Sequence, residues 1–221
     1  MKPIFIIEHL EPQLWSWCII EYKSISKLVG KDNLWFTNIN KRDKQKLSNY
    51  GKVYTESIKN IDINLDKTCI LDPDAPKTLE PKDAKSFKYF IFGGILGDDP
   101  PRKRTAPELT HFLPKAHKRN IGKEQFSTDN AVYVTSEIIK GKSLKEIEFQ
   151  DTIEIPINNV ESVILPYRYP LIKKSLSPRG TFGCSGMQRP KGRGLNRIPD
   201  IKSKPRISQE LITYLKNKKG F

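Results

Sequence analysis

A glycine-rich stretch that ends in charged residues is the first place where residue types and spacing favour chemistry. Residues 93–105 read Gly-Gly-Ile-Leu-Gly-Asp-Asp-Pro-Pro-Arg-Lys-Arg-Thr, directly after an apolar run, Phe87–Phe92, that predicts a buried strand. Glycines let a backbone approach a ligand closely, and open α/β folds bind ligands beyond the carboxyl ends of their strands. Neither G-x-G-x-x-G nor Gly-Lys-Ser/Thr is present, so a dinucleotide site and a P-loop are not supported. The stretch predicts another kind of ligand site, with a tight turn as the alternative.

A second informative stretch spans residues 120–131. Its Gln125-Phe126 pair predicts a short extended piece, and Ser127 or Thr128 can cap the helix that follows. Asp129 then falls in the first helical turn, where a carboxylate is favourable to the helix dipole. Two interpretations of Asp129 stay open, a capping acid and a site residue.

Alternating strands and helices must position these two stretches. Apolar runs predict strands at 2–8, 34–37, 53–55, 68–71 and 87–92, and helical spacing predicts helices at 12–29, ended by Gly30, and at 41–50. Further short strands are expected at 153–156 and 161–170, and a helix at 207–217, capped by Ser208. This order predicts an α/β fold with a mainly parallel sheet and helices on both faces.

Charge is concentrated at one end of the chain. The 221 residues carry a net charge of +14, with 37% hydrophobic residues, enough for a buried core. Residues 168–221 hold 14 Lys or Arg against two acids, whereas the first 167 residues hold 25 against 23. Such a basic segment favours polyanions such as nucleic acid or a ribosomal surface. A solvated tail that maintains solubility is the alternative.

Several classes of protein are disfavoured. The apolar run Ile4–Ile7 is far shorter than the roughly 20 residues that span a bilayer, so no membrane association is expected. Three widely spaced cysteines without a CxxC pattern suit a reducing compartment, and we expect a cytoplasmic protein. No pair of the three histidines has metal-ligand spacing, so no metal is predicted.

Four stretches together resemble one family. They are residues 5–12 (Phe-Ile-Ile-Glu-His-Leu-Glu-Pro), the loop at 92–105, residues 122–132 (Gly-Lys-Glu-Gln-Phe-Ser-Thr-Asp-Asn-Ala-Val) and residues 161–169 (Glu-Ser-Val-Ile-Leu-Pro-Tyr-Arg-Tyr). The chain is similar to SPOUT-type S-adenosylmethionine (SAM)-dependent methyltransferases. The closest resemblance is to the branch with the eukaryotic arginine methyltransferase of ribosomal small-subunit protein uS3 and archaeal relatives described as RNA methyltransferases. Residues 174–203 depart from this family, which typically has a much shorter connection.

The resemblance implies a C-terminal trefoil knot, a rare exception to the rule that chains do not knot. It implies that SAM lies bent in the knot, held by the loop after the fifth strand and by the turn at 125–130. The cofactor residues so implied are Gly93, Gly94, Ile95, Leu96, Gly97, Arg102, Gln125, Thr128 and Asn130. Ile95 and Leu96 would pack on the adenine, and Arg102 would bind the cofactor carboxylate. A monomer is slightly favoured over the homodimer common among SPOUT enzymes.

An arginine acceptor needs carboxylates, because its guanidinium has a pKa above ~12 and no free lone pair at neutral pH. A carboxylate can orient one nitrogen and take its proton during transfer. The candidates are Glu8, Asp98 and Asp129, with Asp99 as a further acid of the loop. A nucleotide acceptor would instead need one base, for which His9 is the candidate.

The predicted organisation is a SPOUT-like methyltransferase domain at 1–169, a basic Gly/Pro-rich insertion at 170–205 that is expected to be disordered, and a terminal helix at 206–221. The predicted function is SAM-dependent methylation of an arginine in a ribosomal small-subunit protein. RNA methylation and an inactive ribosome- or RNA-binding protein remain the alternatives. The expected partner is accordingly a ribosomal small-subunit protein or a ribosomal RNA surface.

Overall fold

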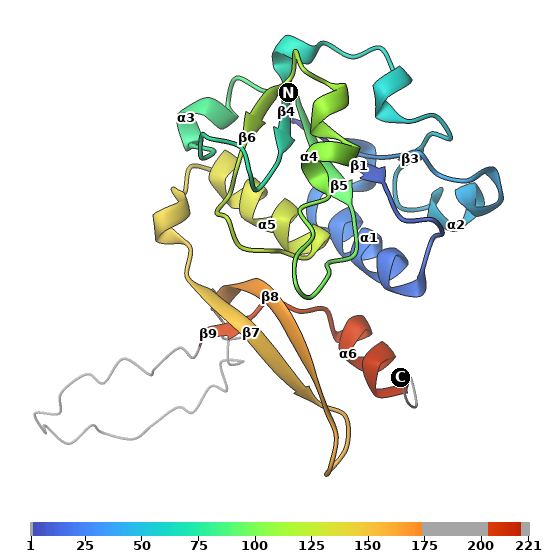
Figure 1. The fold of residues 1–221 in the computed structure, drawn as a ribbon, viewed down its shortest axis with the longest axis vertical. Helices are drawn as coiled ribbons and strands as arrows, with labels where there is room; N and C mark the ends of the chain where they lie inside the picture. The colour runs from blue at the N-terminus through green and yellow to red at the C-terminus, as the bar shows by residue number, and fades with distance from the viewer. Residues whose placement is uncertain (1, 174–202, 218–221) are drawn as a thin grey trace, which may run out of the picture.

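Six parallel strands form the central sheet of the computed structural model, which describes residues 2–173 and 203–217 (Figure 1). The strands lie in the order β3-β2-β1-β5-β4-β6. Their bounds are β1 Ile4–His9, β2 Leu34–Thr37, β3 Lys52–Val53, β4 Thr68–Leu71, β5 Tyr89–Gly94 and β6 His117–Arg119. All pairings between them are parallel, which confirms the predicted α/β class with a mainly parallel sheet.

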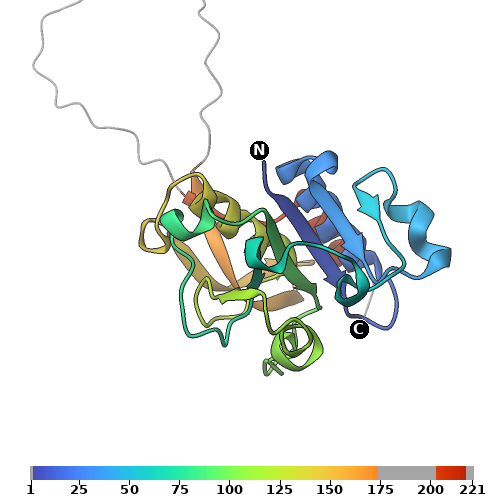
Figure 2. The ribbon, with the colours of Figure 1, turned by 90° about the horizontal axis from the view of Figure 1, so that it is seen from above.

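Helices cover both faces of the sheet, as predicted. On one face, Phe5 and Ile7 of β1 pack in a cluster with α1 (Ser16–Val29) and α5 (Thr128–Ile139). On the other face, Ile6 packs in a second cluster beneath the segment that holds α4. Seen from above, α4 lies on one side of the sheet and α5 on the other (Figure 2). Burial on both faces explains why the central strands are apolar without alternation.

The remaining helices are short. They are η1 Lys31–Asn33, η2 Lys41–Asp43, α2 Lys44–Leu47, η3 Ile58–Asn60, η4 Leu65–Lys67, α3 Pro81–Ala84, α4 Thr105–Glu108, η5 Thr110–Phe112 and η6 Leu144–Glu146. The predicted helix at 41–50 is therefore a 3₁₀ turn followed by one α-helical turn. Gly30 ends α1 with φ 83° and donates its N–H to the Ser26 carbonyl, which confirms the predicted C-cap.

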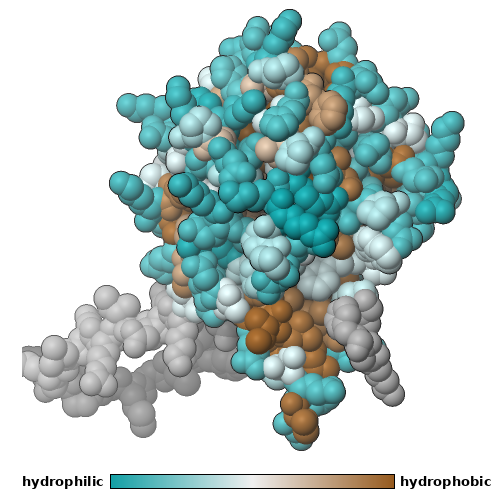
Figure 3. All heavy atoms as spheres, in the orientation of Figure 1, coloured by the Kyte–Doolittle hydropathy of each residue, from teal (hydrophilic) through white to brown (hydrophobic). Residues whose placement is uncertain are grey.

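A second, antiparallel sheet lies below the first and holds β7 (Phe149–Pro156), β8 (Ser162–Lys173) and β9 (Ser203–Pro205). The β7–β8 hairpin projects from the body beside α6 (Gln209–Asn217), and apolar side chains gather on it (Figures 1 and 3). The buried apolar side chains of the hairpin and of α6 pack against Ile20 of α1 in a third cluster. Ser208 caps α6 as predicted, since its Oγ accepts the N–H of Leu211.

Two features differ from the sequence-based expectation. The charged segment that contains His117 is the edge strand β6, and no apolar run marks it because its backbone pairs with β4 on one side only. The domain boundary expected at residue 169 falls inside β8, which continues to Lys173 and pairs with β9. Residues 174–202, where most of the expected disorder falls, lie outside the described residues. The trefoil knot stays a prediction.

Candidate functional site

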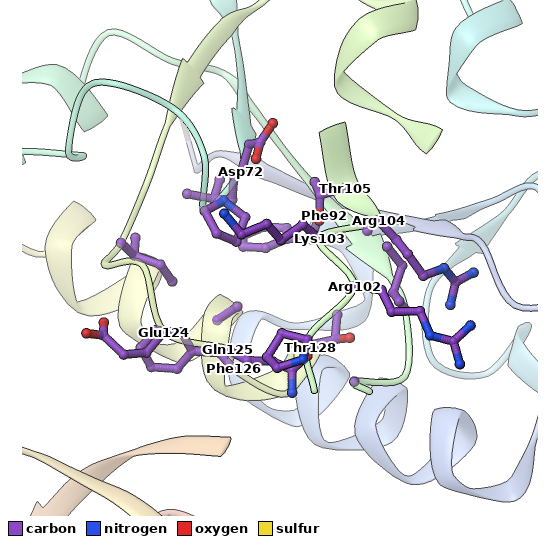
Figure 4. A pocket seen from close by; sticks show the side chains of 18 of the residues that line it. Asp72, Phe92, Arg102, Lys103, Arg104, Thr105, Glu124, Gln125, Phe126 and Thr128 are labelled. Atoms are coloured by element: carbon purple, nitrogen blue, oxygen red, sulfur yellow. The ribbon is translucent and has the colours of Figure 1, made fainter. Parts of the chain in front are cut away.

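A cavity of about 360 Å³ opens at the carboxyl ends of β4, β5 and β6 (Figure 4). Three strand ends and the loops that follow them line it, namely residues 71–73 at β4, residues 92–93, 95–98 and 101–105 at β5, and residues 121–126 after β6. Thr128 and Ala131 of α5 complete the wall. The cavity thus lies where parallel sheets place their ligands, and both stretches singled out in the sequence contribute to it.

The cavity combines apolar walls with a few polar groups. Its apolar lining residues are Phe92, Ile95, Leu96, Ile121, Phe126 and Ala131. Asp72 and Lys103 lie on one side of the cavity and Gln125 and Phe126 on the other, and the Asp72 carboxylate points away from Gln125 (Figure 4). The Asp72 carboxylate is buried and accepts the Thr110 hydroxyl at 2.7 Å and the Asp74 N–H at 3.0 Å. Apolar walls with a few convergent polar groups are typical of a cofactor site.

Gly97 and Asp98 lie in a loop that is held by Gln125 and by Tyr167 of β8. Gln125 Nε2 donates to the Asp98 carbonyl at 3.0 Å, and the Tyr167 hydroxyl donates to the Gly97 carbonyl at 3.2 Å. A Cβ atom at Gly97 would lie 2.4 Å from Tyr167 Cε1 and 2.8 Å from Gln125. Burial raises the pKa of Tyr167 to about 12, so its hydroxyl keeps its proton and donates at neutral pH. Only glycine fits this close approach.

The three consecutive cations have different partners. Arg104 is held by Glu108 at 2.7 Å, by Glu11 at 2.7 Å and by the Leu10 carbonyl, and the hydrogen bond to Glu108 is the largest contribution raising its pKa. Lys103 pairs with Asp74 at 2.9 Å. Arg102 is 74% exposed and lies 3.5 Å from Asp98. Its long side chain runs to the same side as Arg104 (Figure 4), and it is the cation with the weakest protein contact.

Most of the residues predicted to bind cofactor lie in this cavity wall. The lining includes Gly93, Ile95, Leu96, Gly97, Arg102, Gln125 and Thr128, and it does not include Gly94 or Asn130. Gly94 is required for packing instead, because a Cβ there would lie 2.4 Å from the Tyr22 hydroxyl. Asn130 is buried and donates to Ser127.

The structure places the three predicted catalytic carboxylates in three different settings. Asp98 lines the cavity, with a side chain that is 26% exposed. Glu8 is fully buried away from that lining and accepts the hydroxyls of Thr37 and Ser57 and the Ile58 N–H. Its contacts fasten β1 to β2 and to η3. Asp99, the further acid of the loop, is not among the lining residues.

Asp129 belongs to a closed polar cluster that we call the Arg206 cluster, made of Ser24, Asp129, Asn130 and Arg206. Arg206 Nη1 donates to Asp129 Oδ2 at 2.7 Å and to Asn130 Oδ1 at 2.8 Å, and Nη2 donates to Ser24 Oγ at 2.9 Å. The guanidinium also stacks over the Tyr133 ring, 5.0 Å from its centroid. Both charged side chains are mostly buried, at 15% and 9% exposed.

Sequence reasoning missed a lining residue, Asp72, and two residues that support the site from elsewhere. Asp72 directly follows the apolar run at 68–71, so its place at the end of a buried strand was a usable signal. Tyr167, which fixes the Gly97 loop, comes from a distant hairpin, and nothing local predicts its contact. Arg206 is joined to Asp129 across 77 positions of sequence.

In residues 2–173 and 203–217, no group of three or more His, Cys, Asp or Glu side chains could hold a metal ion. No helix of that part of the chain has the length and apolar character needed to cross a membrane.

Known proteins similar to this chain were found by sequence and by structure. The family model described as protein arginine N-methyltransferase SFM1-like matches residues 4–184. The chain is 37% identical over 193 residues to protein arginine N-methyltransferase SFM1 of Saccharomyces cerevisiae, which covers 80% of this chain and 91% of the yeast protein.

Solved structures share this fold, and two of them bear on the family and the fold class. The crystal structure of yeast SFM1 complexed with SAM has a TM-score of 0.72 at 38% identity, covering 78% of this chain and 84% of the yeast chain. Trm10 from Thermococcus kodakaraensis has a TM-score of 0.52 at 21% identity, covering 65% of this chain and 96% of that one. The second likeness concerns the fold alone.

Proposed function

The chain belongs to the SFM1-like family of protein arginine N-methyltransferases, and from this premise we propose that it methylates an arginine side chain of a protein with SAM as methyl donor. The family match confirms the resemblance predicted from the four sequence stretches. The observation that carries the proposal is the cavity at the ends of β4, β5 and β6, lined by the glycine loop and by the turn before α5. Yeast SFM1 has been crystallised with SAM, which supports this choice of cofactor.

The residues of the cavity fit such a cofactor. Apolar side chains such as Ile95 and Leu96 suit the adenine ring, and Gln125 and Thr128 offer polar atoms for hydrogen bonds. Arg102 has the guanidinium geometry that binds a carboxylate with two hydrogen bonds. Bound SAM would supply an electrophilic methyl group carried by a sulfonium sulfur, and that sulfur would leave as a neutral thioether.

We propose Asp98 as the carboxylate that accepts the proton of the acceptor guanidinium. It is the predicted catalytic acid that lines the cavity, whereas Glu8 and Asp129 already have several hydrogen-bond donors each. As the new N–C bond forms, the guanidinium nitrogen gives its proton to the base, and the product keeps one positive charge. The loop therefore has to orient one nitrogen toward the methyl carbon, and this positioning supplies much of the rate.

We propose a ribosomal small-subunit protein as the substrate and the cytoplasm as the place of action. The supporting observation is the basic C-terminal segment, with 14 Lys or Arg against two acids over residues 168–221. This charge favours docking near ribosomal RNA through counterion release. We also propose a monomer, because the chain resembles the arginine-methylating branch of the family.

Two measurements test the proposal in order. Calorimetric titration of the full chain with SAM should give saturable binding at one site, and an absence of binding would favour an inactive ribosome-binding protein. Radiolabelled SAM is then incubated with small ribosomal subunits, followed by nuclease or protease digestion. We expect label that survives nuclease and is lost with protease. The reverse result would point to an RNA methyltransferase.

A further inference from the structure

A second cavity, of about 250 Å³, lies at the carboxyl ends of β1 and β2, on the same edge of the sheet as the first. It is lined mainly by polar side chains, among them His9, Glu11, Asn38, Asn40, Asp43 and Thr55. Starting from the proposed arginine methylation, we propose that this cavity binds the side chain of the acceptor arginine.

Glu11 joins the two cavities. Its Oε1 accepts the Leu96 N–H at 3.0 Å and Arg104 Nη1 at 2.7 Å, and both of those residues line the first cavity. Glu11 itself lines the second cavity, with a side chain that is 10% exposed. Because one carboxylate contacts both walls, a group bound in the second cavity lies next to the glycine loop where we place the methyl donor.

A second carboxylate gives the cavity its charge. The Asp43 side chain is 6% exposed, and Lys46 contacts it at 2.7 Å with a side chain that is 55% exposed. Arg42 lies 3.7 Å from the other Asp43 oxygen and is 68% exposed. Lys46 and Arg42 have long side chains that are largely in solvent, so they can move aside for a cation that enters the cavity.

His9 is a buried residue in the wall of this cavity. The residue is 4% exposed, and its Nδ1 lies 2.9 Å from the Tyr22 hydroxyl. Its Nε2 has no hydrogen-bond partner among the residues that the structure describes. That nitrogen is inaccessible, and the Gln13 backbone lies close enough to act on the ring, so His9 shapes the cavity wall and offers a ligand no free atom.

Asparagine side chains complete a guanidinium-binding set. Asn38 adopts φ 59° and donates its Nδ2 to the His9 carbonyl at 2.7 Å, which fixes the side chain between the two strand ends. Such a left-handed conformation is tolerated by asparagine. The Asp43 carboxylate and several amide or hydroxyl oxygens match a planar cation with five N–H donors better than they match an anion or an apolar group, whereas Glu11 is already paired with Arg104.

The binding test uses a small probe and its neutral analogue. N-acetyl-arginine amide is titrated into the isotope-labelled full chain, and NMR follows the Asn38 amide and the His9 ring. We expect saturable shifts at both residues with this probe, and no shifts with N-acetyl-citrulline amide, which replaces the guanidinium by a neutral urea. Equal shifts with both compounds, or shifts confined to the first cavity, would overturn the inference.

The matched variants are Asp43→Asn and Asp66→Asn, the second an exposed acid of η4 outside both cavities. Asp43→Asn should raise the KM for the protein substrate about tenfold, with kcat and SAM affinity unchanged, because it removes one charged hydrogen-bond acceptor. Asp66→Asn should behave as the unaltered chain. Identical KM values for the two variants would overturn the inference.

Failure of this inference is separable from failure of the proposed function. A chain that binds SAM and labels protein, while the arginine probe leaves His9 and Asn38 unaffected, retains the function and loses the second cavity as acceptor site. A chain that does not bind SAM, while the probe still shifts both residues, retains a guanidinium site and loses the proposed methyl transfer.

Discussion

The first turn of α5 separates two regions that use the same kinds of residue in opposite ways. Thr128 and Ala131 face the open cavity, whereas Asp129 and Asn130 face the Arg206 cluster. One side is hollow and holds a half-buried carboxylate, Asp98. The other side is filled by a guanidinium from the C-terminal segment, which leaves the carboxylate 9% exposed.

The difference shows that the role of an acidic residue near a site depends on whether a protein cation already pairs with its carboxylate. A helix turns by 100° per residue, so adjacent positions point in different directions. Asp129 is held by the Arg206 guanidinium, and this ion pair stabilises the fold, so its carboxylate is not available to a ligand. The carboxylate of Asp98 has a long contact to Arg102, at 3.5 Å, as its one ion pair within the described residues, and it remains available to a ligand.

The sharpest test of this comparison exchanges the two carboxylates for amides. Asp98→Asn should lower kcat by about 10²–10⁴-fold, because a general base of this kind contributes that much to proton transfer. SAM affinity from calorimetry should change little. Asp129→Asn should instead lower the free energy of unfolding, measured in urea, and reduce kcat much less. Equal losses of kcat and SAM affinity in Asp98→Asn would show that Asp98 only shapes the loop.

Sequence reasoning predicted the parallel sheet because its evidence is local. Runs such as Phe87–Phe92 are buried on both faces, and apolar residues of that kind are visible without knowledge of their partners. The strand β6, His117–Arg119, was not predicted, because an edge strand can be polar and then carries no apolar run. The glycine loop and the Gln125 turn were found because strand ends and helix starts carry sequence signals of their own.

The roles of individual acids could not be predicted in the same way. Glu8, Asp98 and Asp129 all follow a strand or open a helix, so the local pattern treats them alike. Their difference comes from distant partners, Ser57 for Glu8 and Arg206 for Asp129. Such contacts depend on how the chain folds back, which spacing along the sequence does not specify.

A second test removes the cation of the Arg206 cluster. Arg206→Ala should lower the free energy of unfolding by about 3 kcal/mol, because it leaves a buried carboxylate without its charged partner. Urea denaturation measures the change, and the double variant with Asp129→Asn gives the coupling. We expect the second substitution to cost much less once Arg206 is absent. Simple additivity would indicate that the two side chains do not act as a pair.

A third test addresses the open side through its backbone. Gly97→Ala places a Cβ 2.4 Å from Tyr167 and 2.8 Å from Gln125, so the loop has to shift. SAM affinity should fall by about tenfold to a hundredfold, the equivalent of 1–3 kcal/mol of strain. Gly141→Ala is the control, since no atom lies within 4 Å of its Cβ, although its φ of 114° adds backbone strain. Unchanged SAM affinity in Gly97→Ala would place the cofactor away from this loop.

The last test is a pH dependence of stability beside the Arg206 cluster. Burial, followed by the nearby Asp129 carboxylate, raises the pKa of Glu21 from 4.5 to about 8 in the folded chain. The carboxyl accepts the Thr128 N–H at 3.2 Å and Trp17 Nε1 at 2.7 Å. A raised pKa means that the folded state holds a proton which the unfolded state has already lost.

The sign follows from proton linkage. The contribution of Glu21 is complete below pH 4.5, decreases as the pH rises from there to about 8, and is absent above it. The free energy of unfolding of Glu21→Gln, measured in urea between pH 5 and 8.5, should therefore rise relative to that of the unaltered chain as the pH increases. Glu137→Gln is the control: although burial acts to raise it, hydrogen bonds from Lys140 and Lys142 leave the pKa of Glu137 lowered, so its titration lies below this range. A parallel pH profile for Glu21→Gln and the unaltered chain would show that Glu21 is ionised in the folded state. The surroundings of Asp129 would then be accessible to water, and the contrast with the open surroundings of Asp98 would disappear.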